Sequence, residues 1–81
     1  MSTRLHDPIT VAAVFQGGRV RPVWFLRQGR RYAVREVTLA WQTKMGSAVC
    51  LHLSVSDGAN EFELVLNQQQ LTWHVEAAEA R

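Results

Sequence analysis

The sequence predicts an all-β protein, built as a single antiparallel meander of about six short strands that is strongly curled or partly barrel-like. Three observations favour this fold class. Apolar residues recur with a period of two, the interruptions are clusters of Gly, Asn, Asp, Ser and Gln, and no segment carries the apolar stripe of an amphipathic helix.

Each predicted strand ends at a turn signal. The stretches GG, QG, KMGS, DGAN and NQQQ separate the apolar runs, and Gly and Asn adopt turn conformations at little steric cost. The predicted strands are Ile9 to Gln16, Arg19 to Arg27, Arg30 to Thr43, Ala48 to Ser56, Glu61 to Asn67 and Leu71 to Glu76.

The register of the last three strands follows from the lengths of their loops. A loop over 57–60 and a second over 67–70 would bring the apolar residues of all three strands to one face, and a slip of one residue would send them to the other. The predicted pairs are Val55–Phe62, Leu53–Leu64, Leu51–Leu66, Leu66–Leu71, Leu64–Trp73 and Phe62–Val75.

The first two turns set the register of the other strands. A two-residue turn at Gln28 and Gly29 would place Phe25 opposite Tyr32. Beyond Val34 the apolar parity shifts by one residue, so we expect a bulge near Arg35–Glu36 that bends the strand and keeps one continuous core face. That face would include Val37, Leu39 and Trp41, whereas a two-residue GG turn would place Ile9, Val11, Ala13 and Phe15 on the face of Trp24.

Length and composition predict one small β domain over residues 1–81, with a flexible N-terminal segment at 1–8 and a frayed C-terminus at 77–81. The lone Cys50 cannot form an internal disulfide, and the polar STRLHD after Met1 is unlike a signal peptide. The longest apolar run is VAAVF, far short of the ~20 residues that span a bilayer. We therefore expect a cytoplasmic protein with no membrane partner.

Charge is distributed unevenly along the chain. Residues 1–45 carry eight Lys or Arg and two Asp or Glu, a balance of +6, whereas residues 46–81 carry one and five, a balance of −4. Such an asymmetry could steer a polyanion toward the first half, or let one copy meet another.

Several of these positions also form a pattern, P-x2-F-x3-G-R-x-Y-x-V-x2-V-x3-W, which comprises Pro22, Phe25, Gly29, Arg30, Tyr32, Val34, Val37 and Trp41. A later FEL and a terminal W-x-V extend it. In these residues the chain resembles a family of small uncharacterised bacterial proteins that are associated with genes for translesion DNA polymerases. The resemblance covers roughly Gly18 to Glu76, and it implies no activity, cofactor or catalytic residue.

Two sets of polar residues invite a chemical interpretation. Ser54, Glu63 and His74 would line up across three strands, but two strand spacings separate Ser54 from His74 by ~9.5 Å, too far for the ~3 Å bond of a nucleophile to its base. A metal site from Cys50, His52 and His74 would have only two ligands on one strand face, whereas closed zinc sites have about four. We therefore predict no enzymatic activity, no metal and no cofactor.

The stretch RPVWFLRQGRRYAVREV, Arg21 to Val37, holds five arginines and three aromatic residues. Arginine contacts phosphates and a tryptophan can stack on bases, although arginines also protect exposed strands. We expect a small binding module that acts through protein interaction or self-association; the alternative is binding of single-stranded nucleic acid. The candidate binding face comprises Trp24, Arg31, Arg35, Arg19, Arg27 and Arg30.

Overall fold

The chain forms a seven-stranded antiparallel sheet, so the predicted all-β class is confirmed. The computed structural model describes the backbone of residues 3–80 and the side chains of residues 6–80. Within that range, no helix is long and apolar enough to cross a membrane. The strands are β1 (Thr3–Gln16), β2 (Arg19–Arg27), β3 (Arg30–Ala33), β4 (Glu36–Met45), β5 (Ala48–Ser56), β6 (Asn60–Asn67) and β7 (Thr72–Ala80).

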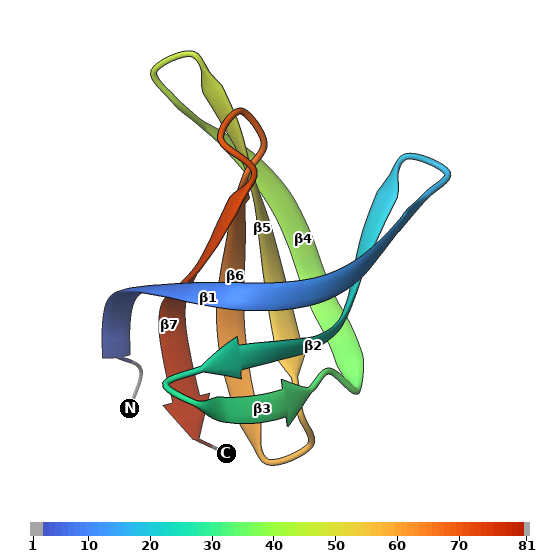
Figure 1. Ribbon diagram of the computed structural model, residues 1–81, viewed down its shortest axis with the longest axis vertical. Coiled ribbons are helices and arrows are strands. Elements are labelled where there is room, and N and C mark those ends of the chain that lie inside the picture. The colour runs from blue at the N-terminus through green and yellow to red at the C-terminus, as the bar shows by residue number, and fades with distance from the viewer. Residues whose placement is uncertain (1–2, 81) are drawn as a thin grey trace.

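The strand order is β3-β2-β1-β7-β6-β5-β4, which is a meander from β4 to β7 and a second one from β1 to β3. In Figure 1, β1, β2 and β3 run across the strands β4 to β7. The two end strands, β3 and β4, are consecutive in the chain, yet no ladder joins them among the described residues. The sheet is therefore open, and the prediction of a strongly curled or partly barrel-like sheet is wrong.

The sheet is open because the two residues between β3 and β4, Val34 and Arg35, bond to different strands. The backbone N–H of Val34 donates to the carbonyl of Val23 at 2.9 Å and completes the β2–β3 ladder. The next N–H, of Arg35, donates to the carbonyl of Ser56 at 2.8 Å, and the pairing of β4 with β5 begins there. The predicted single strand Arg30 to Thr43 is thus divided at the place where a bulge was expected, and its two parts lie at opposite ends of the sheet.

Strands also extend further at both ends of the described chain than the sequence predicts. β1 begins at Thr3 and β7 continues to Ala80, and the two pair with each other. Residues 3–8 and 77–80 therefore lie in strands, beyond the predicted strand ends; residues 1, 2 and 81 lie outside the described residues.

The predicted two-residue turns are both present. Gln28 and Gly29 have φ of 53° and 76°, and Gly17 and Gly18 have φ of 59° and 75°. Positive φ at both central residues is the conformation of a type I′ turn, whose twist matches that of the strands it joins. The Gln28–Gly29 turn produces the predicted pairing of Phe25 with Tyr32.

The registers of the last three strands are confirmed in part. Between β5 and β6, Val55 pairs with Phe62 and Leu53 with Leu64, as predicted. Between β6 and β7 the register of Leu64 and Leu66 is two residues away from the prediction, because Leu71 lies in the turn with φ of 57° and Asn67 pairs with Thr72. A bulge at Glu63 and Leu64 adds one more residue, so Phe62 pairs with Ala78. A shift of two residues preserves the side-chain face, so Phe62, Leu64 and Val75 still point inward. Leu71, which was also predicted to belong to the core, is 75% exposed in the turn, and that part of the prediction is wrong.

Two bulges change the faces predicted for the first half. The β1–β2 register shifts between Ala12 and Ala13, so Val11 lies opposite Phe25 and on the core side rather than beside Trp24. The β4–β5 register shifts between Val37 and Leu39. Leu39 and Trp41 consequently lie on the outer face, where they are 64% and 38% exposed, and the prediction that they belong to the core is wrong.

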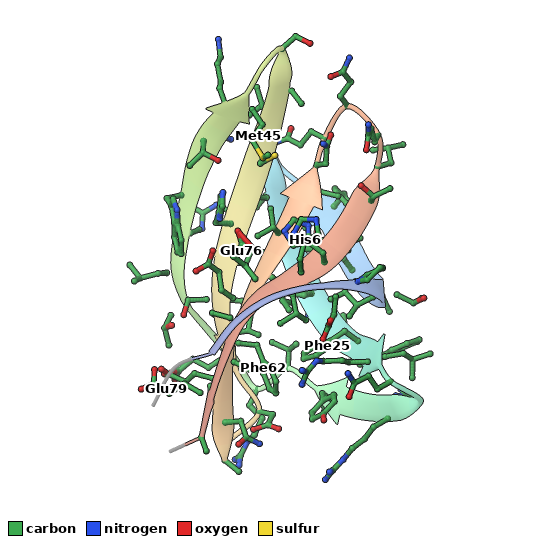
Figure 2. The ribbon with its side chains drawn as sticks, turned by 90° about the vertical axis from the view of Figure 1, so that its left-hand side faces the viewer. His6, Phe25, Met45, Phe62, Glu76 and Glu79 are labelled. Carbon is green, nitrogen blue, oxygen red and sulfur yellow. The ribbon has the colours of Figure 1, made fainter. Side chains whose placement is uncertain are left out.

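The core lies between β2–β3 and β5–β7 and is centred on three aromatic rings. Phe25 stacks on Tyr32 and meets Phe62 edge-on, each with ring centroids 5.1 Å apart. Figure 2 shows Phe25 and Phe62 directed toward each other from the two layers. The other members of the buried cluster are Leu53, Val55, Leu64 and Val75.

Candidate functional site

An open cleft of about 1050 Å³ lies between the β1–β2 hairpin and the strands β4 and β5. Its floor includes Leu51, Leu53 and Leu66, and its rim includes Phe15, which is 62% exposed. The four residues of β3 pair only with Trp24 to Arg27 of β2. The first residues of β2 therefore have no β3 partner, and the cleft lies beside them. An extended apolar segment would fit the chemistry of this lining.

The strand that borders the cleft, β4, is a free edge. Among the described strands it pairs only with β5, and every one of its residues is exposed. On its outer face β4 carries Leu39, Trp41 and Met45, which are 64%, 38% and 65% exposed. An exposed edge of this length presents backbone donors and acceptors with which another strand can pair.

Trp24 and Arg31, two residues of the predicted binding face, stack on each other. Both side chains lie on the outer face of the β2–β3 hairpin, where Trp24 pairs with Ala33 and Arg31 with Leu26. The guanidinium carbon of Arg31 lies 4.5 Å from the centre of the Trp24 ring, and the ring is half-buried. This cation–π contact fixes a flat, positively charged stack on the surface.

Arg27 and Arg30 pair with each other at the β2–β3 turn and belong to the opposite face. The Nε of Arg27 donates to Oδ2 of Asp7 at 3.2 Å, which ties β2 to β1. The guanidinium carbon of Arg30 lies 5.4 Å from the ring centre of Tyr32. Both arginines therefore have partners within the fold and do not join the Trp24–Arg31 stack.

The remaining two predicted arginines lie at other places in the fold. Arg19 is at the tip of the β1–β2 hairpin and lines the cleft. Arg35 lies in the β3–β4 connection against the turn of the β5–β6 hairpin, where a Cβ on Gly58 would be 2.7 Å from its Nη1. The six predicted residues thus occupy several separate positions rather than one continuous face.

His52 is held in a chain of hydrogen bonds across the outer face of β4, β5 and β6. Its Nδ1 lies 3.0 Å from Oε2 of Glu63 and its Nε2 lies 2.7 Å from Oγ1 of Thr43, while Trp41 stacks on the ring at 5.1 Å. This is the order of groups in a nucleophile–base–carboxylate triad. The large cleft lies on the inner side of the sheet, and Thr43, His52 and Glu63 do not line it. We therefore assign these hydrogen bonds a structural role, which is to join the three strands.

A second group of polar side chains was not predicted. His6 of β1 and His74 and Glu76 of β7 offer ligand atoms that all lie within 4.8 Å of one another. The predicted row of Ser54, Glu63 and His74 is not formed, because His74 pairs with Val65 and Pro8 instead. The sequence signal for the real group is the i, i+2 spacing of His74 and Glu76, but its partner His6 lay in the segment predicted to be flexible.

The protonation of His74 is biased by its surroundings. Burial lowers the pKa of His74, the nearby His6 lowers it further, and the carboxylate of Glu76 acts in the opposite direction without cancelling the effect. The net result favours the neutral imidazole, which has a lone pair available. Cys50, which we had considered beside His52 and His74 in the sequence, is a buried free thiol.

Comparisons of this chain with protein-family models, with curated proteins and with solved structures find no match. The family resemblance of the pattern from Pro22 to Trp41 therefore stays a prediction. What the protein does has to be inferred from its own surfaces.

Proposed function

We propose that the protein is a small non-enzymatic binding module that acts through protein interaction, and that its principal partner is a second copy of the same chain. The observation that carries this proposal is the free edge of β4, which is exposed throughout and presents Leu39, Trp41 and Met45 to solvent. Such an edge leaves a row of backbone donors and acceptors without a strand partner.

The two edges of the sheet differ in a way that supports β4 as the contact. β3 has only four residues and carries Arg30 and Arg31, and a short, charged edge resists the addition of another strand. β4 has ten residues, and its single lysine, Lys44, lies near one end. β4 is therefore the edge with the weaker protection.

The sequence of β4 is also complementary to itself. In an antiparallel pair of β4 strands with its two-fold axis near Ala40, Leu39 of each copy would face Trp41 of the other on the outer face. The same arrangement brings Glu36 at one end of the strand toward Lys44 of the second copy. Opposite charges and paired apolar side chains favour this register over a slipped one.

The test is the mass of the protein in solution, measured by sedimentation or light scattering at micromolar concentration. We expect the wild type to dimerise and Leu39→Lys to be monomeric, because the added charge would lie among apolar side chains. Leu26→Lys is the matched control: Leu26 is 38% exposed on β2, at the other end of the sheet, so its substitution should not affect the dimer.

Two outcomes would contradict the dimer. A wild type that stays monomeric throughout the micromolar range rules it out and directs attention to a different protein as the partner of β4. A Leu39→Lys variant that dimerises as well as the wild type would show that another surface joins the copies.

The Trp24–Arg31 stack favours a second candidate function, the binding of single-stranded nucleic acid. A base can stack on the guanidinium plane that already covers Trp24, and Arg31 can also contact a phosphate. Because Arg19, Arg27, Arg30 and Arg35 lie away from this stack, we expect few phosphate contacts with each bound oligonucleotide. Each contact contributes about −0.7 to the slope of log affinity against log salt.

Fluorescence anisotropy with a labelled oligonucleotide measures that slope directly. Arg31→Ala should weaken binding and flatten the slope by about 0.7, whereas Trp24→Ala should cost about 1–3 kcal/mol with little change of slope. Arg19→Ala, at the tip of the β1–β2 hairpin, is the control and should bind as the wild type does. An absence of binding at low salt would rule this function out.

A further inference from the structure

The three side chains of the unpredicted group are brought together by the pairing of β1 with β7. His6 lies two residues before Pro8, the residue of β1 that pairs with His74. The β6–β7 register shifts at Glu63 and Leu64, where Glu76 is the extra residue of a bulge in β7. Figure 2 shows His6 and Glu76 side by side on the surface that faces the viewer.

The ligand atoms of the group lie within 4.8 Å of one another, slightly further apart than in an occupied metal site. The Nε2 of His74 lies 3.5 Å from Oε2 of Glu76, and the Nδ1 of His6 lies 3.9 Å from the same oxygen. Zinc binds histidine nitrogen and carboxylate oxygen at about 2.0–2.2 Å, so the donors of a tetrahedral site are roughly 3.3–3.5 Å apart. Small rotations of the His6 side chain, which is 79% exposed, would close the remaining difference.

We propose that His6, His74 and Glu76 form a three-ligand site for a borderline divalent transition metal such as Zn²⁺. Two imidazole nitrogens and one carboxylate oxygen suit Zn²⁺ and its neighbours in the first transition row better than Ca²⁺ or Mg²⁺, which prefer oxygen ligands alone. The exposure of His6 leaves the fourth position open to water or to a ligand from outside.

The third histidine of the chain provides an internal contrast. Both ring nitrogens of His52 already lie within hydrogen-bonding distance of Glu63 and Thr43, and the ring is stacked on Trp41. A metal could bind His52 only if one of these bonds broke. The Nε2 of His74, by comparison, faces Oε2 of Glu76, which is itself a ligand atom of the proposed site, so a metal would replace that contact by bonds to both atoms. A metal should therefore perturb the resonances of His6 and His74 and leave those of His52 nearly unchanged.

A metal at this position would join β1 to β7. It would hold the first described strand of the sheet against the last in sequence, in addition to the backbone ladder between them. A ligand that binds the folded state and not the unfolded chain raises the apparent stability in proportion to the logarithm of its concentration. The unfolding midpoint should therefore rise with added Zn²⁺.

The experiment is a calorimetric titration of the full chain with Zn²⁺, followed by the absorption of bound Co²⁺ and by the imidazole resonances of the three histidines. We expect one ion per chain. His6→Ala and Glu76→Gln should each weaken Zn²⁺ binding by at least about 10–100-fold. That is the loss seen when a residue that only supports a metal ligand is removed, and the loss of a ligand itself should be no smaller. Glu79→Gln, an exposed carboxylate on the same strand but outside the group, is the matched control and should bind as the wild type does.

The outcomes that would overturn the proposal are specific. The first is an absence of saturable binding by the folded wild type at millimolar Zn²⁺. The second is binding that neither His6→Ala nor Glu76→Gln weakens, and the third is a response of the His52 resonances in place of those of His6 and His74. His6→Ala alters a highly exposed side chain, so circular dichroism should show that this variant keeps its fold.

Discussion

Phe25 is the residue whose removal should damage the fold most. Its side chain is fully buried, and it contacts Tyr32 from the same hairpin and Phe62 from the other layer, with ring centroids 5.1 Å apart in both cases. Phe→Ala substitutions in a core cost about 3–5 kcal/mol, and each aromatic pair accounts for roughly 0.5–1.5 kcal/mol. With two such pairs lost, we expect Phe25→Ala to cost about 4–5 kcal/mol.

That loss is large against the stability of the whole domain. For the 81 residues of this chain, a typical free energy of unfolding is roughly 4–12 kcal/mol. Phe25→Ala should therefore remove from about a third of that free energy to all of it. Phe25→Leu, which keeps most of the volume, should cost about 1–1.5 kcal/mol. Urea denaturation measures both costs, provided that the m-values stay constant.

Phe15→Ala is the control for Phe25→Ala, because Phe15 is 62% exposed and its substitution should change stability by less than about 0.5 kcal/mol. A cost below about 2 kcal/mol for Phe25→Ala, or an equal cost for Phe15→Ala, would refute the assignment of the aromatic cluster as the centre of the core. If Phe25→Ala does not fold, the comparison of Phe25→Leu with Phe15→Ala still decides the question.

Three further predictions concern the turns. Gly58→Ala should destabilise the protein by more than about 1 kcal/mol in thermal unfolding, because φ is +100° and the new Cβ would meet Arg35; a neutral effect would contradict this. Leu71→Gly should stabilise it by up to about 1 kcal/mol, since Leu71 is 75% exposed with φ of 57°; a loss of stability would mean that its side chain matters. Burial raises the pKa of Asp57, but hydrogen bonds from Ala59 and Asn60 outweigh it and lower that pKa below 3.8. The ionised carboxylate therefore stabilises the fold above pH 3.8. Asp57→Ala should lower the free energy of unfolding by about 1 kcal/mol at neutral pH. This difference between variant and wild type should vanish as the pH falls through the lowered pKa.

Alternation and loop length were sufficient to predict the strands of the second half. The β5–β6 register was correct because Asp57, Gly58, Ala59 and Asn60 form a compact turn, in which Oδ1 of Asp57 accepts the N–H groups of Ala59 and Asn60 at 2.9 and 2.7 Å. The predicted β6–β7 register was wrong because Leu71 has a positive φ in the turn. Positive φ is uncommon for a residue other than glycine, so the sequence gives no sign of it.

Bulges limited the prediction elsewhere. The shift opposite Ala12 and Ala13 and the shift after Val37 each exchange the two faces of a strand, but neither changes the alternation of residue types along the chain. The stack of Trp24 and Arg31 could be predicted because both lie in one hairpin. The group of His6, His74 and Glu76 could not, because it depends on the pairing of β1 with β7, which no local pattern specifies.

The position of β1 between β2 and β7 has a consequence for the order in which the chain can fold. A chain made from its N-terminus presents β1 and β2 early, but the other neighbour of β1 is synthesised after β3, β4, β5 and β6. Until β7 is available, β1 has an edge without a partner and the aromatic core lacks the cover of Val75. Contacts so far apart in sequence slow folding and prolong the exposure of apolar strands, so the apolar face of the nascent sheet should stay exposed until β7 can pair with β1.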